Sequence, residues 1–289
     1  MPLLEVDHVV VQFGGVTAVD EACFAAEAGR VTGLIGPNGA GKTTCFNVIS
    51  GLQKPTRGAV RFDGRKVTSV PVHRRSKRGM GRTFQRLEAF GSLSVRDNVR
   101  VAADIHRGLL GAVRGLGSSS RGGVDALLER VGIAAYADER ADSIPTGTAR
   151  LLELARCLAG DPQLLLLDEP SSGLDETETD DFGDLLRDLA VEGRAILMVE
   201  HDMDLVMGVC DEIHVLDFGS VIASGTPQAI RGDAAVQKAY LGYAPDAEHP
   251  AEHPAEHPAE ATRTDLPVLG DDTTVLPAVG ASPLPGGAR

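Results

Sequence analysis

The stretch 36–43 reads GPNGAGKT, and its pattern decides the fold that the rest of the chain must build. It matches the motif GxxxxGK[ST], follows the apolar run VTGLI at 31–35 and precedes a helical pattern at 44–50. Glycines in such a loop let backbone N–H groups close around phosphate oxygens. The context therefore predicts a phosphate-binding loop between a buried strand and a helix, rather than a glycine-rich turn that binds nothing.

The side chains of this loop have expected roles in binding a nucleotide. Lys42 is expected to reach the β- and γ-phosphates, and the Thr43 hydroxyl is expected to ligate Mg²⁺. The residues expected to contact the nucleotide here are Gly36, Pro37, Asn38, Gly39, Ala40, Gly41, Lys42, Thr43 and Thr44. The loop thus predicts that the protein binds a nucleoside triphosphate together with a magnesium ion.

A second motif, LLLLDEP at 164–170, places two carboxylates at the end of an apolar run. Ligands collect at the carboxyl ends of the strands in parallel α/β sheets. Asp168 can hold Mg²⁺ through its waters, and Glu169 can accept a proton from an attacking water. Two solvated loop carboxylates are the alternative, but beside a phosphate loop the motif favours a nucleoside triphosphatase.

Apolar runs of strand length alternate with helical patterns along most of the chain. Strands are expected at 3–13, 31–35, 164–167 and 195–199, and a helix at 177–189. This alternation predicts an α/β fold with a largely parallel sheet that is covered on both faces. Residues 86–142 instead show short helical patterns around a Gly/Ser/Arg-rich stretch, which predicts an inserted helical subdomain.

The pattern changes near Tyr243, where the apolar periodicity stops. Residues 247–258 repeat AEHP three times, and half of the 16 prolines follow residue 244. Such a segment buries too little apolar surface to offset its ordering entropy, so residues 244–289 are predicted to form a disordered tail. Its three histidines offer a weak metal-binding tract as the alternative to a solvated tail.

Composition and charge argue against several classes of protein. The net charge is −13, whereas a nucleic-acid-binding protein usually has a basic surface, so no nucleic-acid partner is expected. The four cysteines are far apart and contain no CxxC pair, as expected for reduced thiols in a cytosolic protein. No signal peptide is visible and no apolar run approaches the roughly 20 residues that span a bilayer. A membrane role would therefore act through a partner.

The segment 143–158, SIPTGTARLLELARCL, predicts a helix whose first turn contains Thr146, Gly147 and Thr148. No acidic residue lies in that turn. Free N–H groups and the positive end of the helix dipole suit an anion such as a phosphate. Gly147 is the position where the backbone is expected to come closest to it.

With these motifs in order, the sequence resembles an ATP-binding-cassette (ABC) ATPase. The motifs that carry the resemblance are GPNGAGKT, RTFQ ending at Gln85, IPTGT at 144–148, LLLLDEP, SGLD ending at Asp175, and VEHD with His201. The resemblance covers residues 3–243, with a helical subdomain at about 86–160. It implies a P-loop NTPase (RecA-like) core with a mostly parallel sheet, together with an antiparallel β subdomain.

The resemblance also implies roles for single residues. Phe13 would stack on adenine, although a phenylalanine buried in the core is the alternative, and Asp175 would communicate across a dimer. Gln85 would sense Mg²⁺ and the γ-phosphate and touch the membrane subunit, while His201 would contact the γ-phosphate. The implied catalytic residues are Glu169, His201 and Gln85, and the implied Mg²⁺ residues are Thr43, Gln85 and Asp168.

In this family two cassettes pair head to tail, so the helix start at Thr146, Gly147 and Thr148 would face the ATP of a second cassette. The segment departs from the LSGGQ pattern, because Pro145 replaces the serine and removes one N–H donor. Two threonine hydroxyls remain available. The departure bears on the rate of hydrolysis more than on ATP binding.

The stretches GMGRTFQRLEAFGSLSVRDNV (79–99) and VEHDMDLVMGVCDEIHVLDFGSVIASGTP (199–227) resemble cassettes of branched-chain amino acid importers. The implied function is ATP hydrolysis that energises the uptake of branched-chain amino acids or related small solutes through a membrane permease. A solute-binding protein outside the membrane would deliver the solute to that permease. The implied location is peripheral, on the cytoplasmic face of the membrane. A lipid or polysaccharide exporter cassette and a soluble ABC ATPase remain as alternatives.

Overall fold

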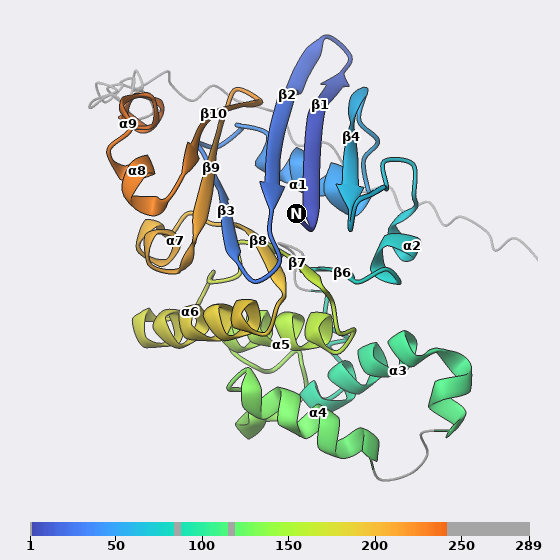
Figure 1. Ribbon diagram of the computed structural model, residues 1–289. Helices are drawn as coiled ribbons and strands as arrows, with labels where there is room; N and C mark the ends of the chain where they lie inside the picture. The colour runs from blue at the N-terminus through green and yellow to red at the C-terminus, as the bar shows by residue number, and fades with distance from the viewer. Residues whose placement is uncertain (1, 84–87, 115–118, 242–289) are drawn as a thin grey trace, which may run out of the picture. The chain divides into compact units, whose positions relative to one another are not determined.

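The computed structural model describes residues 2–83, 88–114 and 119–241 and shows two sheets in that part of the chain. The first is antiparallel, with the strand order β2-β1-β4-β5 (Figure 1). Its strands are β1 (Leu4–Phe13), β2 (Val16–Ala26), β4 (Arg57–Phe62) and β5 (Arg65–Lys66). This sheet is the antiparallel β subdomain that the resemblance implied.

The second sheet has six strands in the order β10-β9-β3-β8-β7-β6. These are β3 (Val31–Ile35), β6 (Met80–Arg82), β7 (Leu164–Asp168), β8 (Ala195–Val199), β9 (Glu212–Asp217) and β10 (Ser220–Gly225). Every neighbouring pair is parallel except β10 with β9. The predicted, largely parallel sheet is therefore confirmed.

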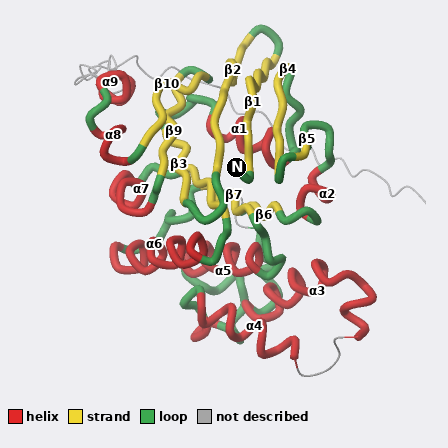
Figure 2. Tube along the Cα trace, in the orientation of Figure 1, coloured by secondary structure: helices red, strands yellow, loops and turns green. Residues whose placement is uncertain are grey.

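Helices connect these strands, as Figure 2 shows in red. Those that follow or flank the sheets are α1 (Lys42–Ser50), α2 (Val72–Ser76), α6 (Glu176–Val191), α7 (Met203–Val209), α8 (Pro227–Arg231) and α9 (Ala234–Leu241). The inserted helices are α3 (Val95–Arg114), α4 (Ser119–Arg130), the 3-10 turn η1 (Ala134–Tyr136) and α5 (Thr146–Leu158). Helix α5 contacts both α3 and α4.

The central strands are buried on both faces, which explains why their sequences are continuous apolar runs rather than alternating ones. In β7, Leu165 and Leu167 belong to a core that includes residues of α5, α6 and α7. Leu164 and Leu166 face the opposite core, which includes residues of α1 and the antiparallel sheet. The six-stranded sheet thus lies between two apolar layers, and its polar residues gather where the strands end. The predicted tail, 244–289, lies outside the described residues.

A buried arginine closes the carboxyl end of α1. Arg75 in α2 is 2% exposed, and its guanidinium donates to the carbonyl oxygens of Val48 and Ile49 at 2.8 and 2.5 Å. It also donates to the carbonyls of Thr68 and Val70 at 3.0 and 2.8 Å. Burial lowers the pKa of Arg75 to about 10, so the group stays charged at neutral pH. A positive charge at this end of a helix complements its dipole.

We expect Arg75→Met to lower the free energy of unfolding by about 3 kcal/mol, because several hydrogen bonds from a charged donor are lost in a buried site. Thermal unfolding followed by circular dichroism measures this as a fall in melting temperature of at least about 5 °C. The matched control is Arg74→Met, since Arg74 is exposed on the same helix. Equal melting temperatures for the two variants would show that the Arg75 contacts contribute little.

Candidate active site

The loop between β3 and α1 is fixed by glycines that no other residue could replace. Gly36 has a φ of 148°, and a Cβ there would lie 1.9 Å from the carbonyl oxygen of Leu216 in β9. Gly41 has a φ of 102°, and its Cβ would lie 2.4 Å from the carbonyl oxygen of Ala18 in β2. The loop is therefore held between the two sheets, and its conformation is set by close backbone contacts.

Lys42 directly follows the glycines of this loop and is the first residue of α1, where its side chain is buried. Its ammonium donates to the carbonyl oxygens of Gly36 and Pro37 at 2.7 and 2.9 Å. Burial lowers the pKa of Lys42, while the carboxylates of Glu169 and Asp168 oppose that shift. The positive charge is thus positioned between the loop backbone and the acidic end of β7.

The residues around the start of α1 fit a magnesium–triphosphate group. The helix has no acidic residue in its first turn, and its N-cap, Gly41, makes no side-chain capping bond. The first N–H groups of a helix have no partner within the helix and attract anions. The Thr43 side chain is exposed at this turn, and Asn38 and Gly39 are exposed on the loop before it. These groups could hold the phosphates and the cation.

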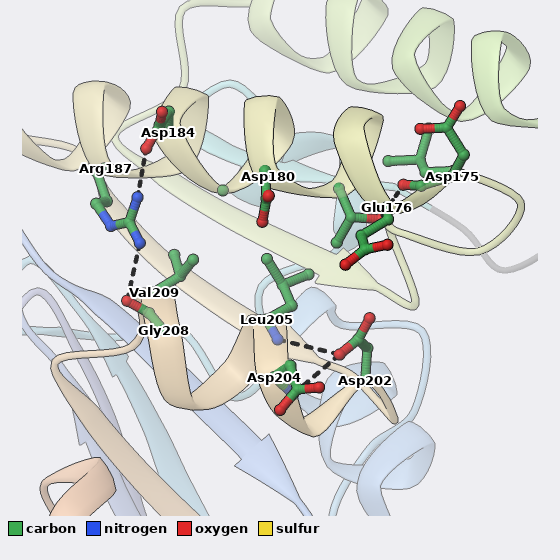
Figure 3. Close-up of a pocket in the computed structure, with 13 residues that line it drawn as sticks. Asp175, Glu176, Asp180, Asp184, Arg187, Asp202, Asp204, Leu205, Gly208 and Val209 are labelled. Atoms are coloured by element: carbon green, nitrogen blue, oxygen red, sulfur yellow. Dashed lines mark hydrogen bonds and ion pairs between the residues drawn. The ribbon is translucent and has the colours of Figure 1, made fainter.

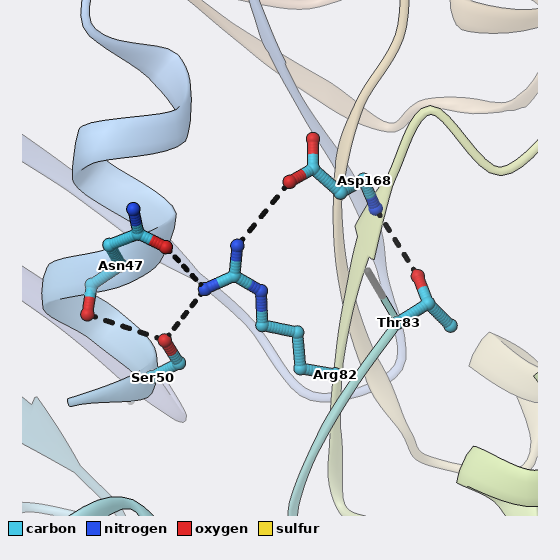
Figure 4. Close-up of polar contacts among 5 residues, drawn as sticks. All are labelled: Asn47, Ser50, Arg82, Thr83 and Asp168. Atoms are coloured by element: carbon cyan, nitrogen blue, oxygen red, sulfur yellow. Dashed lines mark hydrogen bonds and ion pairs between the residues drawn. The ribbon is translucent and has the colours of Figure 1, made fainter. Parts of the chain in front are cut away.

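Asp168 ends β7 as a buried carboxylate that is 4% exposed. Arg82 in β6 donates to its Oδ2 at 3.4 Å and, through Nη1, to Asn47 Oδ1 and Ser50 Oγ of α1 at 2.8 Å each (Figure 4). The Asp168 backbone N–H donates to Thr83 Oγ1 at 3.3 Å. Arg82 therefore ties the phosphate-loop helix to the strand end that presents the carboxylate.

Two effects act on the charge of Asp168. Burial raises its pKa, and the neighbouring Glu169 raises it further by repulsion. Arg82 lowers it, because the positive charge and its hydrogen bond favour the carboxylate form. Arg82, with a smaller contribution from Arg150, favours the anionic form of Asp168 against burial, and only the anion suits a cation and its waters.

Glu169, the next residue, turns away from the strand. Its φ is 50°, in the left-handed region where a residue other than glycine costs about 1–3 kcal/mol. Its backbone N–H still donates to the Val199 carbonyl at 2.9 Å, and its Oε1 lies 2.8 Å from Nε2 of His201. The structure therefore brings together Glu169 and His201, two of the residues predicted to be catalytic.

A third carboxylate, which the sequence analysis did not identify, supports this pair. Glu200 is buried between the loops that follow β7 and β8. Its Oε1 accepts from the Ser171 N–H at 2.8 Å, and its Oε2 accepts from the His201 N–H at 2.9 Å. Glu200 thereby fixes the backbone on both sides of the Glu169–His201 contact. Its position inside VEHD, between the strand and His201, was the only signal available.

The start of α5 is partly enclosed by its own chain. Thr146 is exposed, but Gly147 and Thr148 are buried. A Cβ at Gly147 would lie 2.7 Å from the carbonyl oxygen of Gly173 and 2.9 Å from a methyl carbon of Leu174. The need for glycine at position 147 is thus explained by packing within the chain, where we had expected it to come from a phosphate. Of these three residues, Thr146 is the accessible one.

Asp175 has a local structural role. It is the N-cap of α6 and forms a capping box with Glu178, whose N–H donates to Asp175 Oδ1 at 2.8 Å. Glu178 Oε2 accepts from the Asp175 N–H at 3.0 Å. Asp175 also lines a pocket of about 590 Å³ between α6 and α7, together with Asp202 at the start of α7 (Figure 3). The pocket continues the acidic end of the sheet along the two helices.

One aromatic residue lies on the hairpin that contacts the phosphate loop, and another lies beside the Gly36 backbone. Phe13 is 50% exposed at the end of β1, opposite Val16, so the ring is not a core residue. Ala18, further along the same hairpin, contacts the loop at Gly41. Burial raises the pKa of the Tyr240 hydroxyl in α9, and the Gly36 backbone beside it opposes that shift. Tyr240 was not identified as a site residue from the sequence.

Gln85, predicted for both catalysis and Mg²⁺ binding, lies in 84–87, outside the described residues. The structure does bring together the phosphate loop, Asp168, Glu169 and His201 at the carboxyl ends of β3, β7 and β8. Arg82, Glu200 and Tyr240 complete the arrangement. It can bind a polyphosphate, hold a cation near Asp168 and accept a proton at Glu169.

Two family models match the sequence. One, described as ABC transporter, matches residues 19–172, which is more than half of the chain. The other, described as branched-chain amino acid ATP-binding cassette transporter, matches residues 220–245. The chain belongs to the ABC transporter family. It is an ATP-binding cassette of that family and hydrolyses ATP.

Curated relatives and a solved structure agree with this assignment. The cassette is 38% identical over 252 residues, 84% of its length and 99% of the relative, to the high-affinity branched-chain amino acid transport ATP-binding protein BraF of Pseudomonas aeruginosa. It is 31% identical over 242 residues, 84% of its length and 98% of the relative, to the lipopolysaccharide export system ATP-binding protein LptB of Haemophilus influenzae.

A crystal structure of the ADP conformation of an ATP-binding cassette of an ABC transporter superposes with a TM-score of 0.74 at 27% identity, covering 84% of this cassette and 99% of that chain. The similarity therefore extends over the core and the inserted helices together. Within the described part of the cassette, no helix has both the length and the apolar character that a membrane crossing requires.

We expect Arg82→Gln to shift the acid limb of the pH profile of ATP hydrolysis upward by about 1 unit. Without Arg82, only the weaker attraction of Arg150 opposes burial and Glu169, so the pKa of Asp168 rises and the carboxylate is lost at a higher pH. Initial rates of phosphate release between pH 5 and 9 measure the shift. Arg82→Lys should restore much of the profile, because it retains the charge. A profile that stays in place in Arg82→Gln would contradict this dependence.

Proposed function

We propose that the cassette is the ATP-hydrolysing subunit of an importer for branched-chain amino acids or related small solutes, docked peripherally on a membrane permease at its cytoplasmic face. The observation that carries the proposal is the 38% identity to BraF over 84% of the cassette. The match of residues 220–245 to the branched-chain amino acid model supports it independently. A solute-binding protein outside the membrane would deliver the solute to the permease.

At the site, Lys42 and the loop N–H groups bind the β- and γ-phosphates, while Phe13 stacks on adenine. The Thr43 hydroxyl, the Asp168 carboxylate and Gln85 would hold Mg²⁺, and the ion would supply charge that polarises the phosphates. The loop conformation and the contact of Arg82 with the Asp168 carboxyl group support these roles. Tyr240, which lies beside the Gly36 backbone, would steady the first turn of the loop.

Glu169 accepts the proton of the attacking water, and His201 orients that carboxylate and contacts the γ-phosphate. The contact of 2.8 Å between Glu169 Oε1 and His201 Nε2 supports this division of roles. Glu200 holds the two loops by their backbone N–H groups, so the pair keeps its spacing while the proton moves. Phosphoryl transfer requires mainly positioning and charge stabilisation, which this arrangement supplies.

A second cassette would complete the site by placing its own α5 start over the γ-phosphate. The exposed Thr146 supports this, because its hydroxyl lies at a helix start that has no acidic residue in its first turn. The Asp175 loop lies against the same helix start within the chain, through Gly173 and Gly147. The position of Asp175 would therefore depend on whether the second cassette is in place, which is how Asp175 would communicate across the dimer.

The permease would dock in an apolar groove of about 710 Å³ between the core and the inserted helices. The residues that line this groove include Val72, Phe90 and Ile105. Ile105 is 74% exposed. Arg82 of β6 also lines the groove, and the chain continues from β6 toward Gln85. A permease segment seated there would therefore lie next to the residues that sense the nucleotide.

The exporter alternative rests on one observation, the 31% identity to LptB over 84% of the cassette. Because the cassette itself does not touch the solute, the site geometry does not separate import from export. The identity to LptB is lower than the identity to BraF, and residues 220–245 match the branched-chain amino acid model. Both observations favour the importer.

The function is tested in proteoliposomes that contain the cassette, its co-purified permease and internal Mg-ATP. We expect uptake of leucine, isoleucine or valine that requires a solute-binding protein.

Glu169→Gln should retain ATP binding but lose at least about 100-fold in turnover, and uptake should stop, because the general base is absent. Near-normal turnover in Glu169→Gln would place the base elsewhere. Stimulation of hydrolysis by a glycolipid alone, without amino acid uptake, would favour the exporter.

The proposed contact between cassettes predicts that Thr146→Asp acts only in the dimer. An aspartate at a helix start leaves the fold intact, since it complements the dipole, but it repels the triphosphate of a partner. ATP affinity of the monomer should stay within about twofold, while the ATP-dependent dimer of Glu169→Gln should disappear in the double variant. Light scattering after size exclusion measures both species.

The matched control for this test is Gln228→Asp, which adds the same charge to the exposed first turn of α8. That variant should leave the trapped dimer unchanged. A dimer that persists in Thr146→Asp would show that α5 does not approach the nucleotide of the partner. Substitution of Gly147 is a poorer probe, because any side chain there meets Gly173 in the same chain.

A further inference from the structure

A cluster of three different ligand types lies on the antiparallel sheet, apart from the residues of the nucleotide site. Asp7 and His8 are in β1, and Cys23 is in the neighbouring strand β2. One carboxylate oxygen, one imidazole nitrogen and the thiol sulfur all lie within 4.8 Å of one another. All three residues are exposed. Among the described residues no other group of at least three such side chains comes this close.

A β-bulge brings these side chains together. In a regular strand, the adjacent residues Asp7 and His8 would point to opposite faces of the sheet. Here the register shifts between Val6 and Val9, and His8 has a φ of 45°. The His8 Nδ1 atom then lies 2.8 Å from Asp7 Oδ1, and the His8 N–H donates to Cys23 Sγ at 3.2 Å. The bulge therefore directs two neighbouring side chains to one side, next to the thiol.

The opposite strand accommodates this bulge. Gly58 in β4 has a φ of 87°, and a Cβ there would lie 2.1 Å from the carbonyl oxygen of His8. The close approach is possible only because position 58 has no side chain. The cluster is thus held by backbone packing on both sides of β1, and its geometry does not depend on the flexible side chains alone.

Cys23 is the one accessible thiol of the chain. Of the four cysteines, Cys45 and Cys210 are buried and Cys157 is half-buried, whereas Cys23 is exposed. Burial raises the pKa of each of these other three thiols to about 12, so they are poor ligands at neutral pH. A metal ion that requires a thiolate therefore has a single place to bind.

We propose that Asp7, His8 and Cys23 form a site for a zinc ion, with the fourth position open to water. Thiolate, imidazole and carboxylate are the ligands that Zn²⁺ prefers, and three protein ligands suffice for a site with an open position. The sulfur favours Zn²⁺ over Mg²⁺, which prefers oxygen ligands only. On binding, the Cys23 thiol proton is released, and the proton between His8 Nδ1 and Asp7 Oδ1 moves to His8 Nε2 or, from an imidazolium, is released to solvent. The hydrogen bond between His8 and Asp7 is then replaced by two bonds to the ion.

The test uses the full-length protein, whose predicted tail also contains histidines that could bind metal. Titration with Co²⁺ as a spectroscopic substitute for Zn²⁺ distinguishes binding at the Asp7–His8–Cys23 cluster from binding at the tail histidines. Only a cysteine ligand gives a thiolate-to-cobalt charge-transfer band. We expect this band to saturate at one ion per chain and to disappear when Zn²⁺ is added. Zn²⁺ should also slow alkylation of Cys23 by iodoacetamide at least about tenfold, since a coordinated thiolate is shielded.

Two variants locate the site. Cys23→Ser should abolish the band, and His8→Asn should weaken Co²⁺ binding at least about tenfold, while asparagine still accepts the positive φ. His73→Asn, at an exposed histidine of α2, is the matched control and should bind as the wild type does. Melting temperatures without metal should agree among the four proteins, because the substituted side chains are exposed.

The proposal is overturned if the wild type shows no thiolate band, or if the band survives in Cys23→Ser. It is also overturned if Zn²⁺ leaves the alkylation rate of Cys23 unchanged, since the cluster would then be held by hydrogen bonds without an ion. Metal uptake that persists in Cys23→Ser without a thiolate band would assign binding to the histidines of residues 247–258. None of these outcomes depends on transport or on ATP hydrolysis.

Discussion

The arrangement of the active site depends on the parallel register of β7 and β8. Asp168 pairs with Val199, so the residues that follow each strand, Glu169 and Glu200, leave the sheet side by side. The Glu169 N–H extends the pairing to the Val199 carbonyl at 2.9 Å. A slip of one residue would move the Asp168 carboxyl group into a position that an apolar side chain now occupies, so the cost of burying it there protects this register. The contact between Glu169 and His201 follows from it.

The helix that follows the phosphate loop is constrained in a related way. Buried cations act at both of its ends: Lys42 donates to loop carbonyls at the start, and Arg75 donates to helix carbonyls at the finish. Arg82 then links the side of the helix to Asp168. Three positive side chains thus fix α1 relative to the acidic strand end, and the loop has little freedom to change its shape.

Much of this could be predicted from the sequence, because local patterns carry it. The glycines of GPNGAGKT specify left-handed backbone, and the run LLLLDE specifies a strand buried on both faces that ends in carboxylates. Strand β8 begins and ends where its apolar run does, and β7 extends the predicted strand by one residue, to Asp168. The family resemblance gave the order of the motifs, and the α/β fold with its antiparallel sheet agrees with it.

Long-range polar contacts were not predictable in this way. Arg82, Arg75 and Glu200 are single charged residues that each have a partner at least 26 residues away along the chain, and no periodicity marks them. The same holds for the reason that position 147 is glycine, which is a backbone contact with Gly173. The bulge at His8 was also missed, because alternation along β1 predicts a regular strand where the register in fact shifts.

The contact between Gly147 and Gly173 has a thermodynamic consequence. It joins the start of α5 to the loop that carries Asp175, and that residue caps α6. A ligand that displaced one of these two elements would press on the other, because their backbones are already in contact. Linkage is reciprocal for binding free energies, so a ligand at Thr146 and a protein contact at Asp175 would change each other's affinity by the same factor. If a second cassette contacts both surfaces as proposed, the two contacts would lie on elements that touch within one subunit.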